Sequence, residues 1–255
     1  QERVIDRELE LLQSINHPNI VRFITSYSVD GSIYITEHCG SALSEHIHEG
    51  WYTIEHVKRW TRELLTALDH LHCKKIIHRD LHPNAICINP TGKQLTLVGF
   101  GGARAGDNAR TSDRGAKYYS AIEMMIKLNE SYDEKVDIWS VAVILCEMLN
   151  GRKLFYFEIN AIRAMLELCG PVDEVMTACD DRERDYFFEH AKRSTRKDFI
   201  EHLKRARTGG KRPIDELGID DEINLRDFID RTLQWDPNRR MSAAEAITHP
   251  FLRID

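Results

Sequence analysis

One segment of the chain, "VDIWSVAVILCEML" (residues 136–149), is apolar on almost every side of a helix. A helix without a polar face must be covered by other elements all round. The segment therefore predicts a helix at the centre of a domain large enough to surround it. The chain has 255 residues, which is enough for such a core in one large domain or in two lobes.

The segments around this helix have hydrophobic patterns that predict both helices and strands. Apolar residues recur at helical spacing over residues 3–15 and 54–73, so amphipathic helices are expected there. Runs rich in β-branched and aromatic residues at 20–27 and 32–38 flank the turn signal "SVDG" and predict a hairpin. Further short strands are expected at 76–78, 86–88 and 95–98.

Composition and charge narrow the class of protein. The net charge is −6 and the pI about 6.1, so we expect no surface for nucleic acid or an anionic membrane. No apolar run approaches the roughly 18 residues of a membrane-spanning helix. The six cysteines form no C-x-x-C pair and the paired histidines do not suit a helical metal site. We therefore expect free thiols, no bound metal, and an intracellular protein of the cytoplasm, the nucleus or both.

Five segments follow one another in a specific order. The stretch "IIHRDLHPNAICIN" (76–89) contains H-R-D-L, and a strand-like run then leads to "GFG" (99–101). Upstream lies "DRELELLQSINHPNIVRF" (6–23), and downstream come "YYSAIE" (118–123) and "LQWDPNRRMSAAEAITHPFL" (233–252). This order is similar to that of the protein kinases: the αC helix, catalytic loop, D-F-G, A-P-E and C-terminal helices. The resemblance covers essentially the whole chain.

Within the protein kinases, the resemblance is closest to the mitogen-activated (MAP) kinases. It rests on "VDIWSV", "NGRKLF" and the expected helical insert "LCGPVDEVM" (168–176). The resemblance implies an α+β, protein-kinase-like bilobal fold. Because the chain begins at the αC-like helix, we expect an incomplete N-lobe at residues 1–38. A mostly helical C-lobe with a MAP-kinase-type insert is expected at 39–255.

The positions that carry chemistry in this family are altered. The resemblance assigns the catalytic aspartate to Asp80, which is kept. It assigns the two Mg²⁺-ligand positions to Gly99 and Ala85, and neither residue has a side-chain oxygen for a hard cation. His82, mostly neutral at pH 7, stands where these kinases have a lysine that steadies the γ-phosphate. We therefore expect Mg²⁺ binding to be lost, unless the neighbouring Asn84 acts as a displaced ligand.

The resemblance also marks positions for a nucleotide and for regulation. The adenine-site positions are Thr36, Glu37, Cys39 and Ile86, with Ile86 at the floor. Whether they bind ATP or are plain core stays open. The regulatory positions are Glu8, Arg79, Thr111 and Asp113. The T-x-Y phosphorylation lip of the family falls on Thr111-Ser112-Asp113, so Thr111 is either a phosphosite read by Arg79 or an ordinary loop residue.

The positions that hold the family's scaffold together are kept. A hydrophobic stack linking the lobes is expected from Leu12, Phe23, His78 and Phe100. Glu123 is expected to pair with Arg240, and Asp137 to hold the backbone of the catalytic loop. A fold kept without its chemistry indicates a pseudokinase that acts as a protein-interaction or scaffold module in signalling. The alternatives are a weakly active or active ATP-dependent Ser/Thr kinase with displaced metal ligands, and a switch that binds ATP without metal.

Protein partners are the binding class that this interpretation implies. The MAP kinases have a docking groove for linear peptides that corresponds to residues 41–57 here. The expected docking residues are Leu43, Glu45, Glu49 and Trp51, with Ile47 as a further apolar contact. An ordinary solvated helix face is the alternative.

Overall fold

The computed structural model describes residues 2–28, 32–106, 116, 118–125, 132–154, 169 and 212–254. Thr111, Asp113 and, apart from Cys169, the expected insert at 168–176 lie outside the described residues. Among the residues that are described, no helix is both long and apolar enough to span a bilayer.

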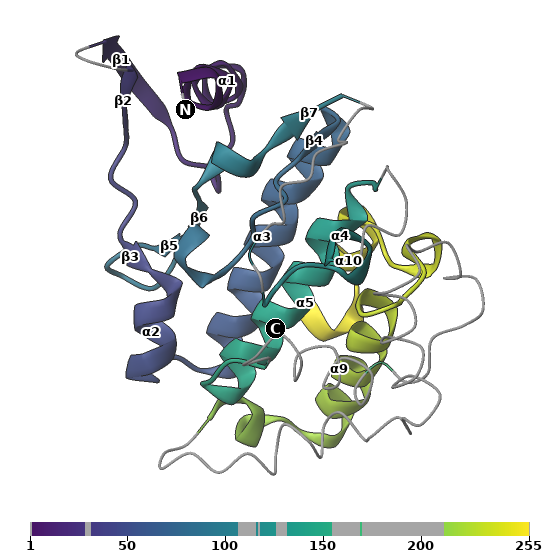
Figure 1. Cartoon of the computed structure of the whole chain (residues 1–255). Coiled ribbons are helices and arrows are strands. Elements are labelled where there is room, and N and C mark those ends of the chain that lie inside the picture. Colours follow the sequence, from purple (N-terminus) through teal and green to yellow (C-terminus); the bar gives the residue numbers. More distant parts are fainter. Residues whose placement is uncertain are drawn as a thin grey trace.

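The first part of the chain forms one helix beside one hairpin (Figure 1). Helix α1 (Glu2–Ser14) leads through a loop to β1 (Phe23–Ser28), which pairs antiparallel with β2 (Ser32–Thr36). The expected helix and hairpin are therefore both present. A bridge between Ile20 and Leu97 joins this part to the rest of the molecule.

Short strands lie between the hairpin and the main helices. One sheet has the order β3-β5-β6 and is antiparallel throughout, and a separate pair joins β4 to β7. The bounds are Ser41–Ala42 for β3, Ile76–Ile77 for β4, Ile86–Ile88 for β5, Leu95–Leu97 for β6 and Arg104–Ala105 for β7. In β5 the side chains of Ile86 and Ile88 are buried and that of Cys87 is half-buried, as expected when alternate residues face opposite sides.

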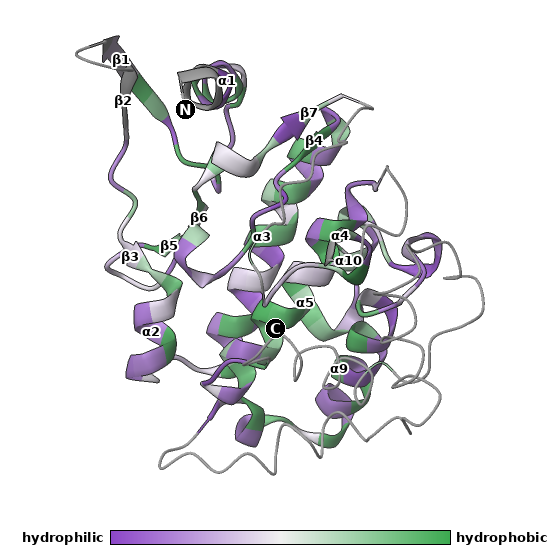
Figure 2. Ribbon diagram, viewed as in Figure 1, coloured by the Kyte–Doolittle hydropathy of each residue, from purple (hydrophilic) through white to green (hydrophobic). Residues whose placement is uncertain are grey.

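Helix α5 (Lys135–Asn150) lies at the centre of the described helices (Figure 1). Every side chain from Val136 to Asn150 is buried, which confirms the expectation from its all-round apolar sequence. The long helix α3 (Ile54–Cys73) packs along it and also covers the β5-β6 sheet. Figure 2 shows the apolar stripe of α3 beside the largely apolar α5.

The remaining described helices complete the larger part. They are α2 (Leu43–Glu49), α4 (Ile122–Met125), α9 (Ile219–Thr232) and α10 (Ala243–Ile247). Two 3-10 turns are important for the site: η1 (Pro83–Ala85) lies between β4 and β5, and η2 (Phe100–Gly102) lies between β6 and β7.

Candidate phosphoryl-transfer site

The loop between β4 and η1 carries the H-R-D sequence, and hydrogen bonds to Asp137 hold this loop in place. The two carboxylate oxygens of Asp137 accept hydrogen bonds from the backbone N–H of His78 (2.9 Å) and of Arg79 (2.8 Å). His72 Nε2 lies 2.9 Å from the same carboxylate. Burial alone would raise the pKa of Asp137, but the hydrogen bond and charge of His72 and the hydrogen bond from the Arg79 N–H lower it. Asp137 therefore stays charged and fixes the loop.

His78 connects this loop to the G-F-G turn. Its ring lies 5.1 Å from the ring of Phe100, edge to face, and its Nε2 is 3.0 Å from the carbonyl oxygen of Val98. Burial lowers the pKa of His78, so the ring is neutral and Nε2–H donates to that carbonyl. Leu12 is buried, while Phe23 is half-buried and lines a cavity with Leu12.

The two positions expected to hold Mg²⁺ face each other. A Cβ added to Gly99 would lie 3.5 Å from the Cβ of Ala85, in ordinary van der Waals contact. Gly99 has a φ of +79°, in the left-handed region. The structure thus brings the two positions together, and it places hydrogen and methyl where a hard cation needs oxygen ligands.

The expected alternative ligand, Asn84, is engaged elsewhere. Ser44 Oγ of α2 donates a hydrogen bond to Asn84 Oδ1. The backbone N–H of Asn84 donates to His82 Nδ1 at 3.2 Å, so His82 caps the η1 turn. Asn84 therefore points to α2, and the described residues at these positions do not fit a pair of magnesium ions.

Glu8 and Asp80 both lie close to the G-F-G-G turn. A Cβ on Gly101 would be 3.5 Å from Glu8 Oε2, and a Cβ on Gly102 would be 3.0 Å from Asp80 Cβ. Glu8 thus points from α1 toward this turn. Arg79 is 5% exposed and its guanidinium lies 5.5 Å from the centre of the Tyr132 ring. Its expected partner at Thr111 lies outside the described residues.

Ile86 is a core residue, which is one of the two alternatives that the sequence leaves open for it. Its side chain is 0% exposed and belongs to the same core cluster as Ile88, Leu95 and Leu97. Cys87 is the half-buried residue on the other face of β5, as the alternation of side chains along a strand predicts.

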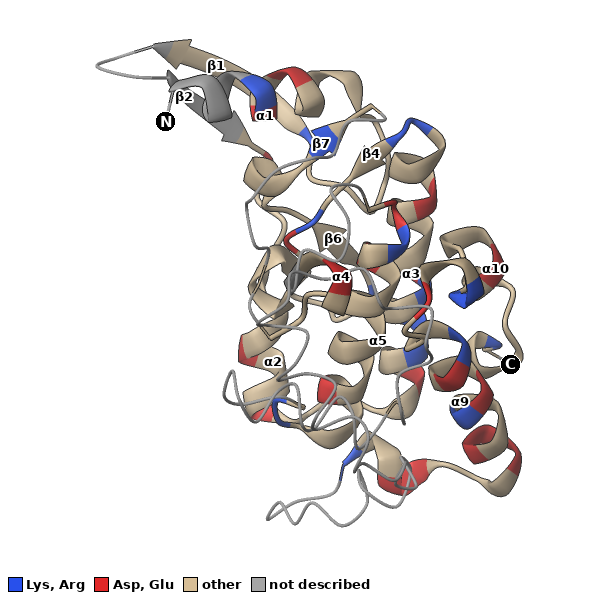
Figure 3. Ribbon diagram, turned by 45° about the vertical axis from the view of Figure 1, so that its right-hand side comes forward, with Lys and Arg blue, Asp and Glu red and all other residues tan. Residues whose placement is uncertain are grey.

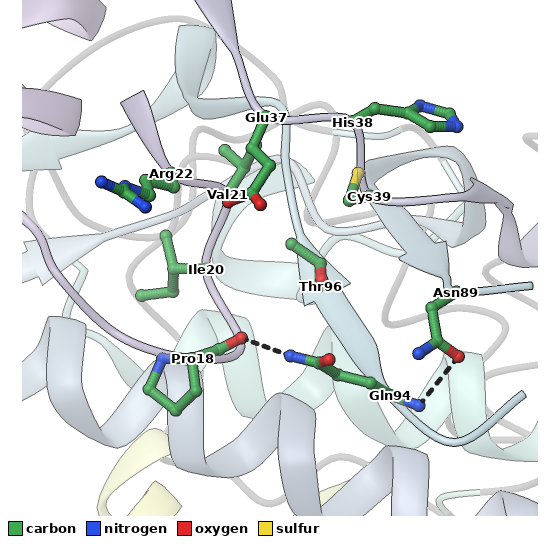
Figure 4. A pocket seen from close by; sticks show the side chains of 10 residues that line it. All are labelled: Pro18, Ile20, Val21, Arg22, Glu37, His38, Cys39, Asn89, Gln94 and Thr96. Atoms are coloured by element: carbon green, nitrogen blue, oxygen red, sulfur yellow. Dashed lines mark hydrogen bonds between the residues drawn. The ribbon is translucent and has the colours of Figure 1, made fainter. Parts of the chain in front are cut away.

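The other adenine-site positions lie along the connection from β2 to β3. Thr36 is half-buried and Glu37 is exposed. Glu37 and Cys39 line a cavity of about 150 Å³ together with Asn89, Gln94 and Thr96 (Figure 4). Gln94 Nε2 closes one side by donating to the carbonyl oxygen of Pro18 at 2.9 Å.

The docking expectation is wrong for Leu43 and Ile47. They are 0% and 4% exposed because α2 turns its apolar side toward the core, so neither can contact a peptide at the surface. Glu45 and Glu49 are exposed. Trp51 is 44% exposed, and its Nε1 donates to His46 Nδ1 at 3.0 Å.

Glu123 and Arg240 form a buried ion pair between α4 and the segment before α10. Arg240 Nη1 lies 2.8 Å from Glu123 Oε1, and Nη2 lies 3.3 Å from Oε2. Arg240 also donates to the carbonyl oxygens of Lys135 and Gln234 and lies over the ring of Trp139. These contacts satisfy the guanidinium, which is the condition for a charge to be buried.

Comparison with known proteins places the chain in a family. A model of the protein kinase domain matches residues 1–252. Mitogen-activated protein kinase HOG1A of Wallemia ichthyophaga is 30% identical over 251 residues, and HOG1B of the same fungus is 31% identical over 252. Mitogen-activated protein kinase HOG1 of Arthrobotrys oligospora is 29% identical over 253.

Each of these alignments covers 96% of this chain. The chain spans 64% of the length of the two Wallemia proteins and 67% of the Arthrobotrys protein. The matched domain and the expected order of elements agree with the α+β, protein-kinase-like fold. The chain therefore belongs to the protein kinase family and is a MAP-kinase-like member of it.

Proposed function

We propose that this chain is a pseudokinase: a protein-interaction or regulatory module with a MAP-kinase-like fold that does not transfer phosphoryl groups efficiently. The observation that carries the proposal is the facing pair Gly99 and Ala85. Phosphoryl transfer in protein kinases relies on metal ions that neutralise charge on the transferred group, and these two positions supply the protein ligands. Neither supplies an oxygen here.

The rival function, a kinase with a displaced ligand, has less support. It needs Asn84 to turn toward Gly99, but Asn84 Oδ1 already accepts a hydrogen bond from Ser44. The kept scaffold supports a retained fold instead, since Asp137 makes its hydrogen bonds to the loop and Glu123 its ion pair with Arg240.

A phosphotransfer assay tests the proposal. The purified protein is incubated with radiolabelled Mg²⁺-ATP and a generic basic protein substrate, alongside the variant Asp80→Asn. We expect background incorporation in both, because the metal ligands are absent whether or not Asp80 is present. Incorporation by the natural protein that Asp80→Asn abolishes would overturn the proposal. Thermal melting with ATP, in Mg²⁺ and in EDTA, then separates loss of nucleotide binding from metal-free binding.

The surface that we propose for a protein partner is the α2 acidic face, defined by Glu45, Glu49 and Trp51. Its two carboxylates and its half-exposed indole suit a basic peptide with an apolar side chain. Figure 3 shows the acidic positions on α2, at the edge of the molecule. The indole is held in place by His46 and by ring contacts with His56 and Trp60, so its exposed part is already ordered.

A further inference from the structure

Two cysteines from distant parts of the chain meet where the β2–β3 connection crosses β5. Cys39 lies in that connection and Cys87 is the central residue of β5. A Cβ on Gly40 would lie 2.0 Å from the carbonyl oxygen of Ile88, so the backbone next to Cys39 lies directly against β5. The pairing of Ala42 with Cys87 and of Ser41 with Ile88 fixes this register.

The side chains of Cys39 and Cys87 lie on the same side of the sheet. Cys87 is opposite Thr96 in the β5-β6 pairing, so both side chains are on the same face of the sheet. Thr96 and Cys39 line the same cavity of about 150 Å³ (Figure 4). The Cys87 thiol is close enough to the Cys39 side chain for the two to interact, and both residues are partly exposed. Of the other described cysteines, Cys146 is fully buried in α5, Cys73 is exposed at the end of α3, and Cys169 is half-buried and interacts with Cys146.

We propose that Cys39 and Cys87 are a redox modification site, at which a peroxide converts the two thiols into a disulfide that ties the β2–β3 connection to β5. The site is independent of phosphoryl transfer, and it requires only the thiols and a small oxidant that reaches the cavity. Disulfides inside reducing compartments are usually transient, which suits a modification rather than a permanent link.

The order of the two steps follows from where the two sulfurs lie. Cys39 lines the cavity, so a peroxide that enters the cavity meets the Cys39 side chain first.

In the first step the Cys39 sulfur attacks one peroxide oxygen, the O–O bond breaks, and the other oxygen leaves with the thiol proton as water. In the second step the Cys87 sulfur attacks the sulfenic acid on Cys39. The S–O bond breaks and the hydroxyl leaves with the Cys87 proton as a second water. Two thiols are oxidised and one peroxide is reduced to two waters.

Peptide mapping tests the site in the natural protein. The protein is treated with a small excess of hydrogen peroxide, its free thiols are blocked with N-ethylmaleimide, and it is digested with trypsin without reductant. Trypsin places Cys39 alone in the peptide 23–58, Cys87 alone in 80–93 and Cys73 alone in 63–74. We expect peptides 23–58 and 80–93 to appear as one cross-linked species, lighter by two hydrogen atoms than their sum, and dithiothreitol to remove it.

Matched variants identify the pair. Cys39→Ser and Cys87→Ser should each abolish the cross-linked species, whereas Cys73→Ser should leave it unchanged. The proposal is overturned if Cys39 and Cys87 are both recovered with maleimide after treatment that oxidises Cys73. It is overturned equally if Cys39 carries only a sulfinic acid, or if either cysteine cross-links to a different partner. The result on the natural protein decides the question even where a variant folds poorly.

Discussion

The methyl group of Ala85 lies 3.5 Å from the point where a side chain on Gly99 would begin. Ala85 is the last residue of the η1 turn, and Gly99 directly precedes the η2 turn. The two residues come together because η1 leads into β5, η2 follows β6, and these two strands pair antiparallel. Around them the supporting contacts are complete, since Asp137 holds the loop below and His78 bonds to Val98. The contacts that hold the loop are therefore kept around two positions that lack a side-chain oxygen.

Restoring these two groups should restore metal-dependent nucleotide binding. In the double variant Ala85→Asn with Gly99→Asp, carboxylate and amide oxygens would converge on one point between the turns. We expect ATP to raise the melting temperature only when Mg²⁺ is present, by roughly 2–4 °C for each kcal/mol by which bound ATP stabilises the folded state. The natural protein should show no Mg²⁺-dependent shift.

The control for this variant is Gly106→Asp. Gly106 also has a left-handed backbone, with a φ of +90°, and an added Cβ meets nothing within 4 Å. Each introduced aspartate costs about 1–2 kcal/mol of backbone strain, but only the one that replaces Gly99 would reach the site. A Mg²⁺-dependent shift in the Gly106→Asp variant, or none in the double variant, would contradict the assignment of the ligand positions.

Breaking the ion pair between Glu123 and Arg240 should strongly destabilise the fold. The variant Glu123→Gln leaves the Arg240 guanidinium buried without its counter-charge, which costs about 3–5 kcal/mol. Urea denaturation measures the change in the free energy of unfolding. The matched control is Arg231→Ala, which breaks an exposed pair with Asp227 and should cost less than about 1 kcal/mol. Equal effects of the two variants would mean that the buried pair has no special role.

Mild acid should destabilise the protein, partly through His17. The ring of His17 stacks on His70 of α3 at 5.1 Å, and burial, followed by the charge of His70, lowers the pKa of His17 below its ordinary 6.5. The unfolded chain then binds more protons than the folded chain, so stability is lost as pH falls through 6.5 and levels off below the folded pKa. The buried His78, whose pKa is also lowered, adds to the same trend.

The variant His17→Asn tests this contribution. In the natural protein the backbone N–H of Asn19 donates a hydrogen bond to His17 Nδ1 at 3.2 Å. The amide oxygen of an asparagine can still accept this hydrogen bond, but an asparagine side chain does not titrate. Stability measured between pH 8 and pH 5 should decline less steeply, by less than about 1 kcal/mol in total because His17 is partly exposed to solvent. An unchanged decline in His17→Asn would exclude the stacked pair as a source.

Charge reversal on the α2 acidic face should weaken capture of a basic peptide. In the double variant Glu45→Lys with Glu49→Lys, we expect the dissociation constant for a synthetic Lys/Arg-rich peptide to rise roughly tenfold at low salt, a change of about 1.4 kcal/mol. Fluorescence polarisation measures it. The double variant Glu10→Lys with Asp220→Lys makes the same change in net charge at exposed positions elsewhere and should bind as the natural protein does. The surface is wrong if both double variants lose affinity equally.

Much of the fold could be read from the sequence because local patterns determine it. The segment around Val136 to Leu149 is apolar on every side, and only a central position satisfies such a helix. The hairpin and helix α3 are confirmed for the same kind of reason, since period and turn residues are local properties. The absence of a side-chain oxygen at Gly99 and Ala85 can also be read from the sequence, because it does not depend on the fold.

The sequence by itself therefore determined which side chains are present and in what order. From this order the family follows, and so does the lack of a side-chain oxygen at Gly99 and Ala85. The tertiary structure alone decided which side chains share a place. Ile86 and Cys87 are neighbours in the chain, but the packing of β5 against α2 and of β6 against α3 buries Ile86 and leaves Cys87 on the side of the sheet where Cys39 lies. Leu43 fits an apolar docking contact by its chemistry, but α2 turns it into the core. The reason is physical: hydrophobic periodicity says that one face is buried, while contacts between distant segments decide against what each face packs.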